Sequence, residues 1–131
     1  FTELPIPYPQ QVLAARERAI KSDPDLFERI LKSIAAGTAF TWDPRNKERV
    51  KTILARYLRL ESVAKAEEHY QSALKVLPKK PYVEMVGISS MIEFMAEADP
   101  LVSKVKPEEV IDHTILKKLD ASGFLDQLYK R

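Results

Sequence analysis

Two Asp-Pro steps, each followed by an amphipathic run, constrain this chain more than any other feature. Asp23-Pro24 precedes the segment LFERILKSI, and Asp43-Pro44 opens a run that ends in Tyr57-Leu58. An aspartate that accepts hydrogen bonds from free amides, with proline at the first helical position, is typical of a helix N-terminus. Apolar residues then recur at helical spacing. The sequence therefore predicts two amphipathic helices in tandem.

Each predicted helix has an apolar face and a charged face. Gly37 should weaken the first helix near its end, because glycine has a low helix propensity. The expected buried residues are Leu26, Phe27, Ile30, Leu31 and Ile34 in the first helix, and Val50, Ile53, Leu54, Tyr57 and Leu58 in the second. On the opposite side of the second helix lie Arg45, Arg49, Arg56 and Arg59. Among the aromatic residues, those expected in the core are Phe27, Tyr57, Tyr70 and Phe124.

The segment before Asp23 has a different character. Prolines at positions 5, 7 and 9 hold the backbone extended and remove amide donors. Residues 11–16 then favour a short strand, or alternatively an irregular lead-in to the helix. We divide the chain into an extended segment over residues 1–20 and helices over 23–131, within one helical domain or part of one.

Further helices are expected after residue 60. One spans about residues 62–77 and stops before Pro78, and another spans about 87–98. Asp99-Pro100 and Pro107 begin short helical turns. Two short helices follow, over 113–121 and 123–129, with Gly123 as a left-handed cap between them. The fold class is therefore mainly α, with at most one or two short strands near the N-terminus.

Composition excludes several kinds of function. The chain has 131 residues, a net charge of +2 and no cysteine, so disulfides, thiolate metal sites and a cysteine nucleophile are excluded. The two histidines, His69 and His113, lack the spacing of a metal site. Glu93 and Glu97 share a helix face but show no sign of a cleft. We expect no catalytic residue, metal or cofactor, and interpret the chain as a non-enzyme.

The arginine side of the second helix leaves two interpretations open. Four arginines can bind phosphate or an acidic partner. However, acidic residues lie nearby at Asp43, Glu48 and Glu61, and the whole chain is nearly neutral. We therefore favour a solvated face and no nucleic-acid partner. Trp42 is expected to pack, although its place at a helix boundary also suits a binding surface.

The order of these elements resembles that of a known protein family. The segments IPYPQQVLAARERAIKSDPDLFERILKSIAAGTAFTWDPRNKERVKTILARYLRL and KPEEVIDHTILKKLDASGFLDQL resemble the C-terminal part of solute-binding proteins of the nitrate, sulfonate, taurine and thiamine-precursor ABC-transporter family. The resemblance implies the helical C-terminal segment of a two-lobed α/β fold of the type II periplasmic-binding-protein kind. Family members are longer, and their glycine-rich N-terminal lobe has no counterpart in this chain.

The resemblance also implies a function. The full protein would capture a small anionic or heteroaromatic solute at the periplasmic or outer face of the cytoplasmic membrane and deliver it to an ABC permease. Tyr8, Gln10 and Gln11 lie where the family's chain returns from the hinge, so they are the expected ligand-facing residues. The alternative is a stand-alone helical protein-interaction domain with no transport role. An enzyme ranks third, because the family extends to thiamine-pyrimidine synthesis proteins.

A consequence follows for the chain on its own. If its helices pack on a lobe's sheet in a longer protein, their apolar surface is left open in the separate piece. Large exposed apolar patches favour self-association. We therefore expect a homo-oligomer of the isolated piece.

Overall fold

The computed structural model describes residues 9 and 11–130. Helices make up 71% of it, and no strand occurs among the described residues, which confirms the mainly α class. The first half contains α1 (Glu17–Ser22), α2 (Pro24–Trp42), the 3₁₀ turn η1 (Pro44–Asn46) and α3 (Lys47–Tyr57). The second half contains η2 (Val63–Ala66), α4 (Glu67–Val76), α5 (Met85–Ala96), η3 (Pro100–Lys104), α6 (Pro107–Val110), α7 (Thr114–Ala121) and α8 (Phe124–Gln127).

Aspartate side chains start the helices as their sequence predicts. The carboxylate of Asp23 accepts a hydrogen bond of 2.9 Å from the Leu26 amide at the start of α2. Asp43 does the same for η1, and Asp99 for η3, each at 3.0 Å. At the other end of the chain, Gly123 adopts the left-handed conformation, with φ of 75°, between α7 and α8. These local predictions are confirmed because they depend on backbone groups within a few residues.

Two local predictions are wrong. Residues 11–16 form no strand, because no other described segment pairs with them. The extended segment is also shorter than expected, since α1 begins at Glu17. Helix α2 runs through Gly37 to Trp42. The Thr41 hydroxyl donates to the Gly37 carbonyl at 2.9 Å, and Ala35 and Thr38, on either side of the glycine, are buried.

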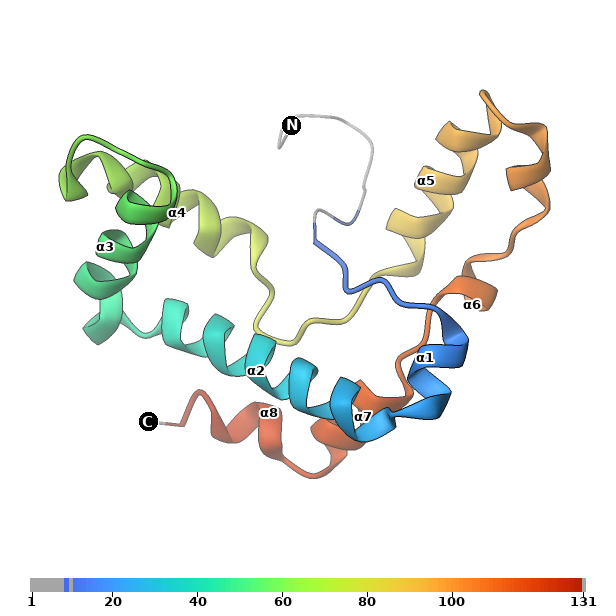
Figure 1. Ribbon diagram of the computed structural model, residues 1–131, viewed down its shortest axis with the longest axis horizontal. Coiled ribbons are helices and arrows are strands. Elements are labelled where there is room, and N and C mark those ends of the chain that lie inside the picture. The colour runs from blue at the N-terminus through green and yellow to red at the C-terminus, as the bar shows by residue number, and fades with distance from the viewer. Residues whose placement is uncertain (1–8, 10, 131) are drawn as a thin grey trace.

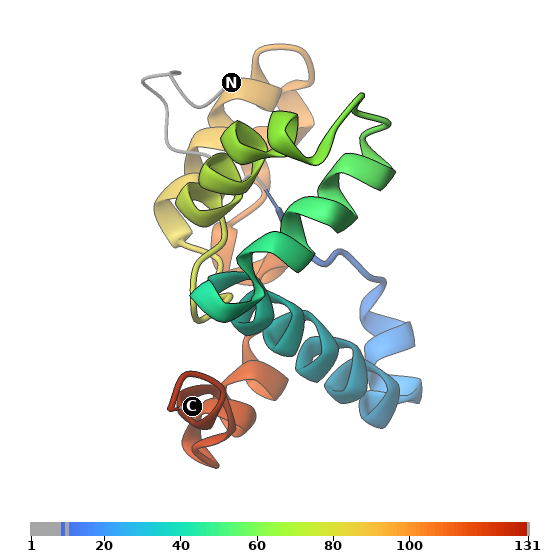
Figure 2. The ribbon, with the colours of Figure 1, turned by 90° about the vertical axis from the view of Figure 1, so that its left-hand side faces the viewer.

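The long helix α2 runs across the lower half of the molecule (Figure 1). Helices α7 and α8 lie along one side of it, below α2 in both views (Figures 1 and 2). Helices α3 and α4 pack together at the C-terminal end of α2, and α5 with η3 and α6 forms a second arm at the opposite end (Figure 1). Residues 11–16 run from the space between the two arms to the start of α1 (Figure 1).

The hydrophobic core lies where α2 meets α7 and α8. It consists of Ala35, Leu116, Leu119 and Leu125, and Leu125 is completely inaccessible to solvent. A smaller packed region joins α3 to η2 and α4, with Val50, Ala66 and Tyr70 buried. These buried residues are few, and several of them are alanines.

The arms expose much of their apolar surface. Tyr57 is 79% exposed, and Ile53 and Leu58 are each more than 40% exposed, so the predicted buried stripe of α3 is wrong at these three positions. The accessible surface of the chain is 9975 Å². A compact monomer of 15.0 kDa is expected to expose about 7,000 Å². The chain therefore leaves more of its surface accessible than a compact domain of this size does.

Candidate functional site

A groove of about 600 Å³ opens between α2, the segment after α4 and the chain before α1. This volume lies within the range of small-molecule sites. Its walls are mainly apolar and come from segments far apart in sequence. They include Val12, Leu13, Leu31, Ile34, Val76, Leu77, Pro78, Pro81 and Val83. Such walls suit the ring or the alkyl part of a solute.

A small number of polar side chains also line the groove. The charged ones are Lys75, at the end of α4, and Glu84, before α5. Thr38 of α2 is only 6% exposed although its side chain is polar, and Gln11 is exposed at the groove. Lys75 forms no ion pair with a described residue. Its ammonium group is therefore available to an anion.

Of the three residues predicted to face a ligand, the structure places one. Gln11 lines the groove, whereas Tyr8 and Gln10 lie outside the described residues. Lys75 and Thr38 did not stand out in the sequence. Lys75 is one of many lysines on helix surfaces, and Thr38 is a polar residue within a helical pattern, so no local signal marks either as part of a groove. They come together only because the chain after α4 returns to α2.

Aromatic contacts fix the wall of the groove that follows α4. The indole Nε1 of Trp42 donates a hydrogen bond of 2.9 Å to the Leu77 carbonyl. The Lys79 ammonium lies 5.1 Å from the centre of the Trp42 ring and 5.5 Å from that of Tyr129, and the Tyr129 hydroxyl donates to the Lys79 carbonyl at 2.8 Å. Trp42 thus packs, as predicted, and in doing so it holds residues 77–79 against the end of α2.

The next part of the same wall is attached to α7. The Val83 amide donates to Nε2 of His113 at 3.1 Å, so Nε2 carries a lone pair and this imidazole has a structural contact. The rings of Tyr82 and His113 meet edge to face, 5.1 Å apart. Burial raises the pKa of Tyr82, and its hydrogen bond to Asp120 raises it further. Tyr82 therefore remains a neutral donor, and residues 80–83 are held in place.

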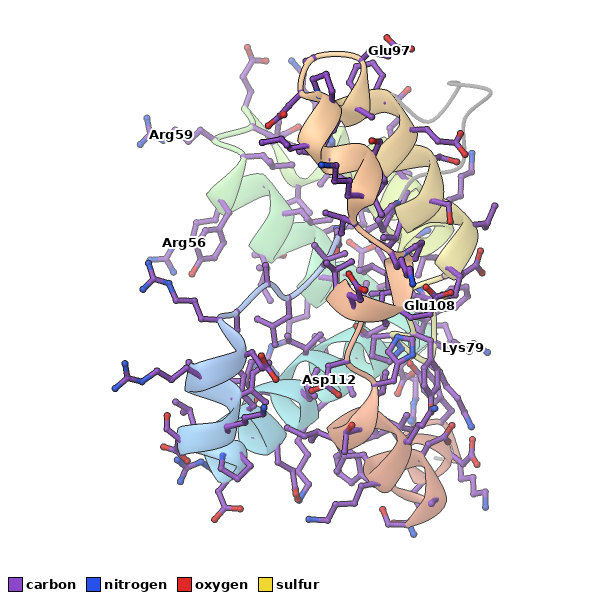
Figure 3. All side chains as sticks on the ribbon, turned by 90° about the vertical axis from the view of Figure 1, so that its right-hand side faces the viewer. Arg56, Arg59, Lys79, Glu97, Glu108 and Asp112 are labelled. Atoms are coloured by element: carbon purple, nitrogen blue, oxygen red, sulfur yellow. The ribbon has the colours of Figure 1, made fainter. Side chains whose placement is uncertain are left out.

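The charged residues singled out in the sequence lie away from the groove. Arg45 pairs with Asp43, and Arg49 lies 5.6 Å from the centre of the Phe40 ring. Arg56 and Arg59 project from one side of the molecule, and Glu97 lies at the tip of the α5 arm (Figure 3). These residues do not converge on a common site. Within residues 9 and 11–130, no three His, Cys, Asp or Glu side chains are grouped to hold a metal ion.

Comparisons with protein-family models, curated proteins and solved structures find no match. None of the helices in the described part of the chain has both the length and the apolar character to cross a bilayer. A functional assignment therefore depends on the residues of the chain and their geometry.

Proposed function

We propose that the chain is part of the substrate-binding component of an ABC-type uptake transporter for a small anionic or heteroaromatic solute. It works at the periplasmic or outer face of the cytoplasmic membrane. The observation that carries the proposal is the groove of about 600 Å³, in which Lys75, Glu84 and Gln11 stand among apolar walls. Its polar groups suit a solute that has one charged end and one apolar or ring-shaped part.

The role of each group follows from its chemistry. The Lys75 ammonium attracts a nitrate, sulfonate or carboxylate group, and the Gln11 amide can donate a hydrogen bond to the same oxygens. The apolar walls from α2 and from residues 76–83 exclude water around the rest of the solute. Binding of this kind needs no covalent step. In a two-lobed protein, closure of the lobes completes the enclosure and presents the solute to the permease.

The helical C-terminal segment of a type II two-lobed fold is the architecture we propose for this chain. The small core and the accessible surface of 9975 Å² support it, because helices that cover a further layer of structure keep apolar residues for that layer. The order of Asp-Pro helix starts agrees with the family resemblance given above.

Calorimetric titration of the chain tests the proposal. Nitrate, taurine, an alkanesulfonate and an aminopyrimidine form the panel, and we expect heat of binding with at least one. Lys75→Ala should weaken the binding of an anionic member at least tenfold. Lys117→Ala, an exposed lysine on α7 outside the groove, is the matched control and should bind normally. Equal binding by both variants, or no binding to any of the four, would contradict the proposal.

The second candidate is a stand-alone helical protein-interaction domain with no transport role. The exposed apolar residues of α5 favour it, since they remain accessible to solvent in the described part of the chain. The two candidates differ in one measurable property. A transport component binds a solute in the groove, whereas an interaction domain leaves the groove empty at every solute concentration.

A further inference from the structure

Helix α5 is apolar around most of its circumference, yet η3 and α6 cover only part of it. Its sequence is MVGISSMIEFMA, and glycine 87 is its only buried residue. The exposed large apolar residues of α5 are Met85, Val86, Met91, Phe94 and Met95, with Phe94 68% exposed. A helix that is apolar on all sides is normally buried. Flexible methionine side chains also adapt well to a partner surface. Helix α5 therefore has the composition of a contact surface.

The free end of α5 is acidic. Glu93 and Glu97 are exposed beside Phe94 and Met95, and neither forms an ion pair with a described residue. Figure 3 shows Glu97 at the tip of this arm. The helix itself contains no lysine or arginine. An acidic surface of this kind repels an anionic membrane and attracts a basic protein surface.

Helix α3 offers the complementary surface. Ile53 and Tyr57 are exposed on it, and Leu58 directly after it is exposed as well. Arg49 and Arg56 share the face of Ile53 and Tyr57, because positions 49, 53, 56 and 57 follow helical spacing, so the prediction that these two arginines lie opposite the apolar residues is wrong. Neither arginine forms an ion pair within the described residues, and Arg49 lies 5.6 Å from the centre of the Phe40 ring. Apolar residues with basic neighbours therefore face solvent here.

We propose that α5 of one copy of this chain packs on α3 of a second copy. The apolar residues of the two helices then cover each other, and Glu93 and Glu97 meet Arg49 and Arg56. The contact cannot form within one molecule, because α3 and α5 stand on opposite arms (Figure 1). The inference goes beyond the proposed solute-binding function, since neither helix supplies a charged residue to the groove.

The available area is sufficient for a stable contact. The accessible surface of 9975 Å² exceeds the value for a compact chain of this mass by about 3,000 Å². A specific interface of standard size buries about 800 Å² on each partner. The surplus of accessible surface is therefore larger than a contact of standard size requires.

Analytical ultracentrifugation of charge-reversed variants tests the contact. The first variant carries Glu93→Lys and Glu97→Lys, so both of its surfaces are basic. The second carries Arg49→Glu and Arg56→Glu, so both of its surfaces are acidic. The control carries Glu17→Lys and Asp25→Lys, two exposed positions on α1 and α2, with the same change in net charge as the first variant. Circular dichroism verifies that each variant keeps its helix content.

We expect the unmodified chain and the control to have at least twice the monomer mass of 15.0 kDa. Each reversed variant alone should be a monomer, and an equimolar mixture of the two should associate again, because each basic surface then meets an acidic one. Three results would overturn the proposal: a monomeric unmodified chain at high concentration, association of either reversed variant alone, or a mixture that remains monomeric. The solute titrations above are independent of all three.

Discussion

The ammonium group of Lys80 lies 2.6 Å from Oδ1 of Asp120, across 40 residues of sequence. The same ammonium group contacts Asp126 at 2.9 Å, and the Tyr82 hydroxyl donates to the second oxygen of Asp120 at 3.0 Å. Hydrogen bonds that Lys80 donates to Asp120 and Asp126 hold the pKa of Lys80 above its usual range, and Lys80 lowers the pKa of Asp120. These contacts attach the segment between α4 and α5 to α7 and α8. They therefore hold one wall of the groove in place.

Removing the Tyr82 hydroxyl should loosen this attachment. Tyr82→Phe keeps the ring against His113 but loses the hydrogen bond to Asp120, so we expect the free energy of unfolding to fall by about 1 kcal/mol. Urea denaturation measures the change. Tyr57→Phe removes a hydroxyl from an exposed ring and is the matched control, with no measurable loss expected. Equal stability of the two variants would show that the hydrogen bond from Tyr82 to Asp120 does not contribute to the free energy of unfolding.

The stability of the chain should fall in acid. Glu28 contacts Lys118 at 2.8 Å and Lys32 at 2.7 Å, and hydrogen bonds from these lysines lower its pKa from 4.5 to about 2. The unfolded chain therefore binds a proton at this site more readily than the folded chain. Stabilisation by Glu28 is complete above pH 4.5 and is lost as the pH falls towards 2.

Thermal unfolding between pH 7 and pH 2.5 measures this dependence. Glu28→Gln cannot titrate, so its melting temperature should decrease less steeply below pH 4.5 than that of the unmodified chain. Glu108→Gln, at an exposed position without an ion pair in the described structure, should follow the unmodified curve. Identical curves for all three proteins would contradict the role assigned to Glu28.

Arg59 occupies a position that favours glycine. Its φ is 54°, and the Leu60 amide donates to the Ala55 carbonyl at 2.9 Å, which is the pattern of a Schellman cap at the end of α3. Arg59→Gly should raise the free energy of unfolding by about 0.5–1 kcal/mol, because glycine adopts this conformation without steric cost. Arg59→Ala retains Cβ and should give no gain. A destabilised glycine variant in urea denaturation would contradict this interpretation.

Leu125 is the residue on which the small core depends most. It is completely buried among Ala35, Leu116 and Leu119. Leu125→Ala should lower the free energy of unfolding by about 2–5 kcal/mol, measured by urea denaturation. Leu101→Ala, at a position that is 68% exposed, should change it by less than about 0.5 kcal/mol. A small effect at Leu125 would show that the core lies elsewhere.

Local signals in the sequence predicted where the helices start. They did not predict correctly which face of α3 is buried. Asp23, Asp43 and Asp99 cap their helices because the capping hydrogen bonds involve only neighbouring residues. Periodicity also located α3 correctly. It did not show that Tyr57 is exposed, because the buried face of a helix depends on what packs against it. Helix α3 packs mainly on η2 and α4, which cover only one side of it.

The candidate site was less predictable than the helices. Gln11 was expected to face a ligand on the basis of a family resemblance, and it lines the groove. Lys75 and Thr38 line the same groove because the chain after α4 returns to α2, which has no signature in either segment. The wall between them depends on Trp42, Tyr82 and His113, whose partners are backbone groups or side chains more than 25 residues away.

Hydrogen exchange of α5 tests most directly the central claim that this helix lacks cover within a single chain. In dilute solution, the amides of Met85–Ala96 should exchange much faster than those of Thr114–Ala121 in α7, because α7 contributes to the core and α5 does not. Their protection should increase as the protein concentration rises and a second copy covers them. If α5 is as protected as α7 in dilute monomer, the claim is contradicted.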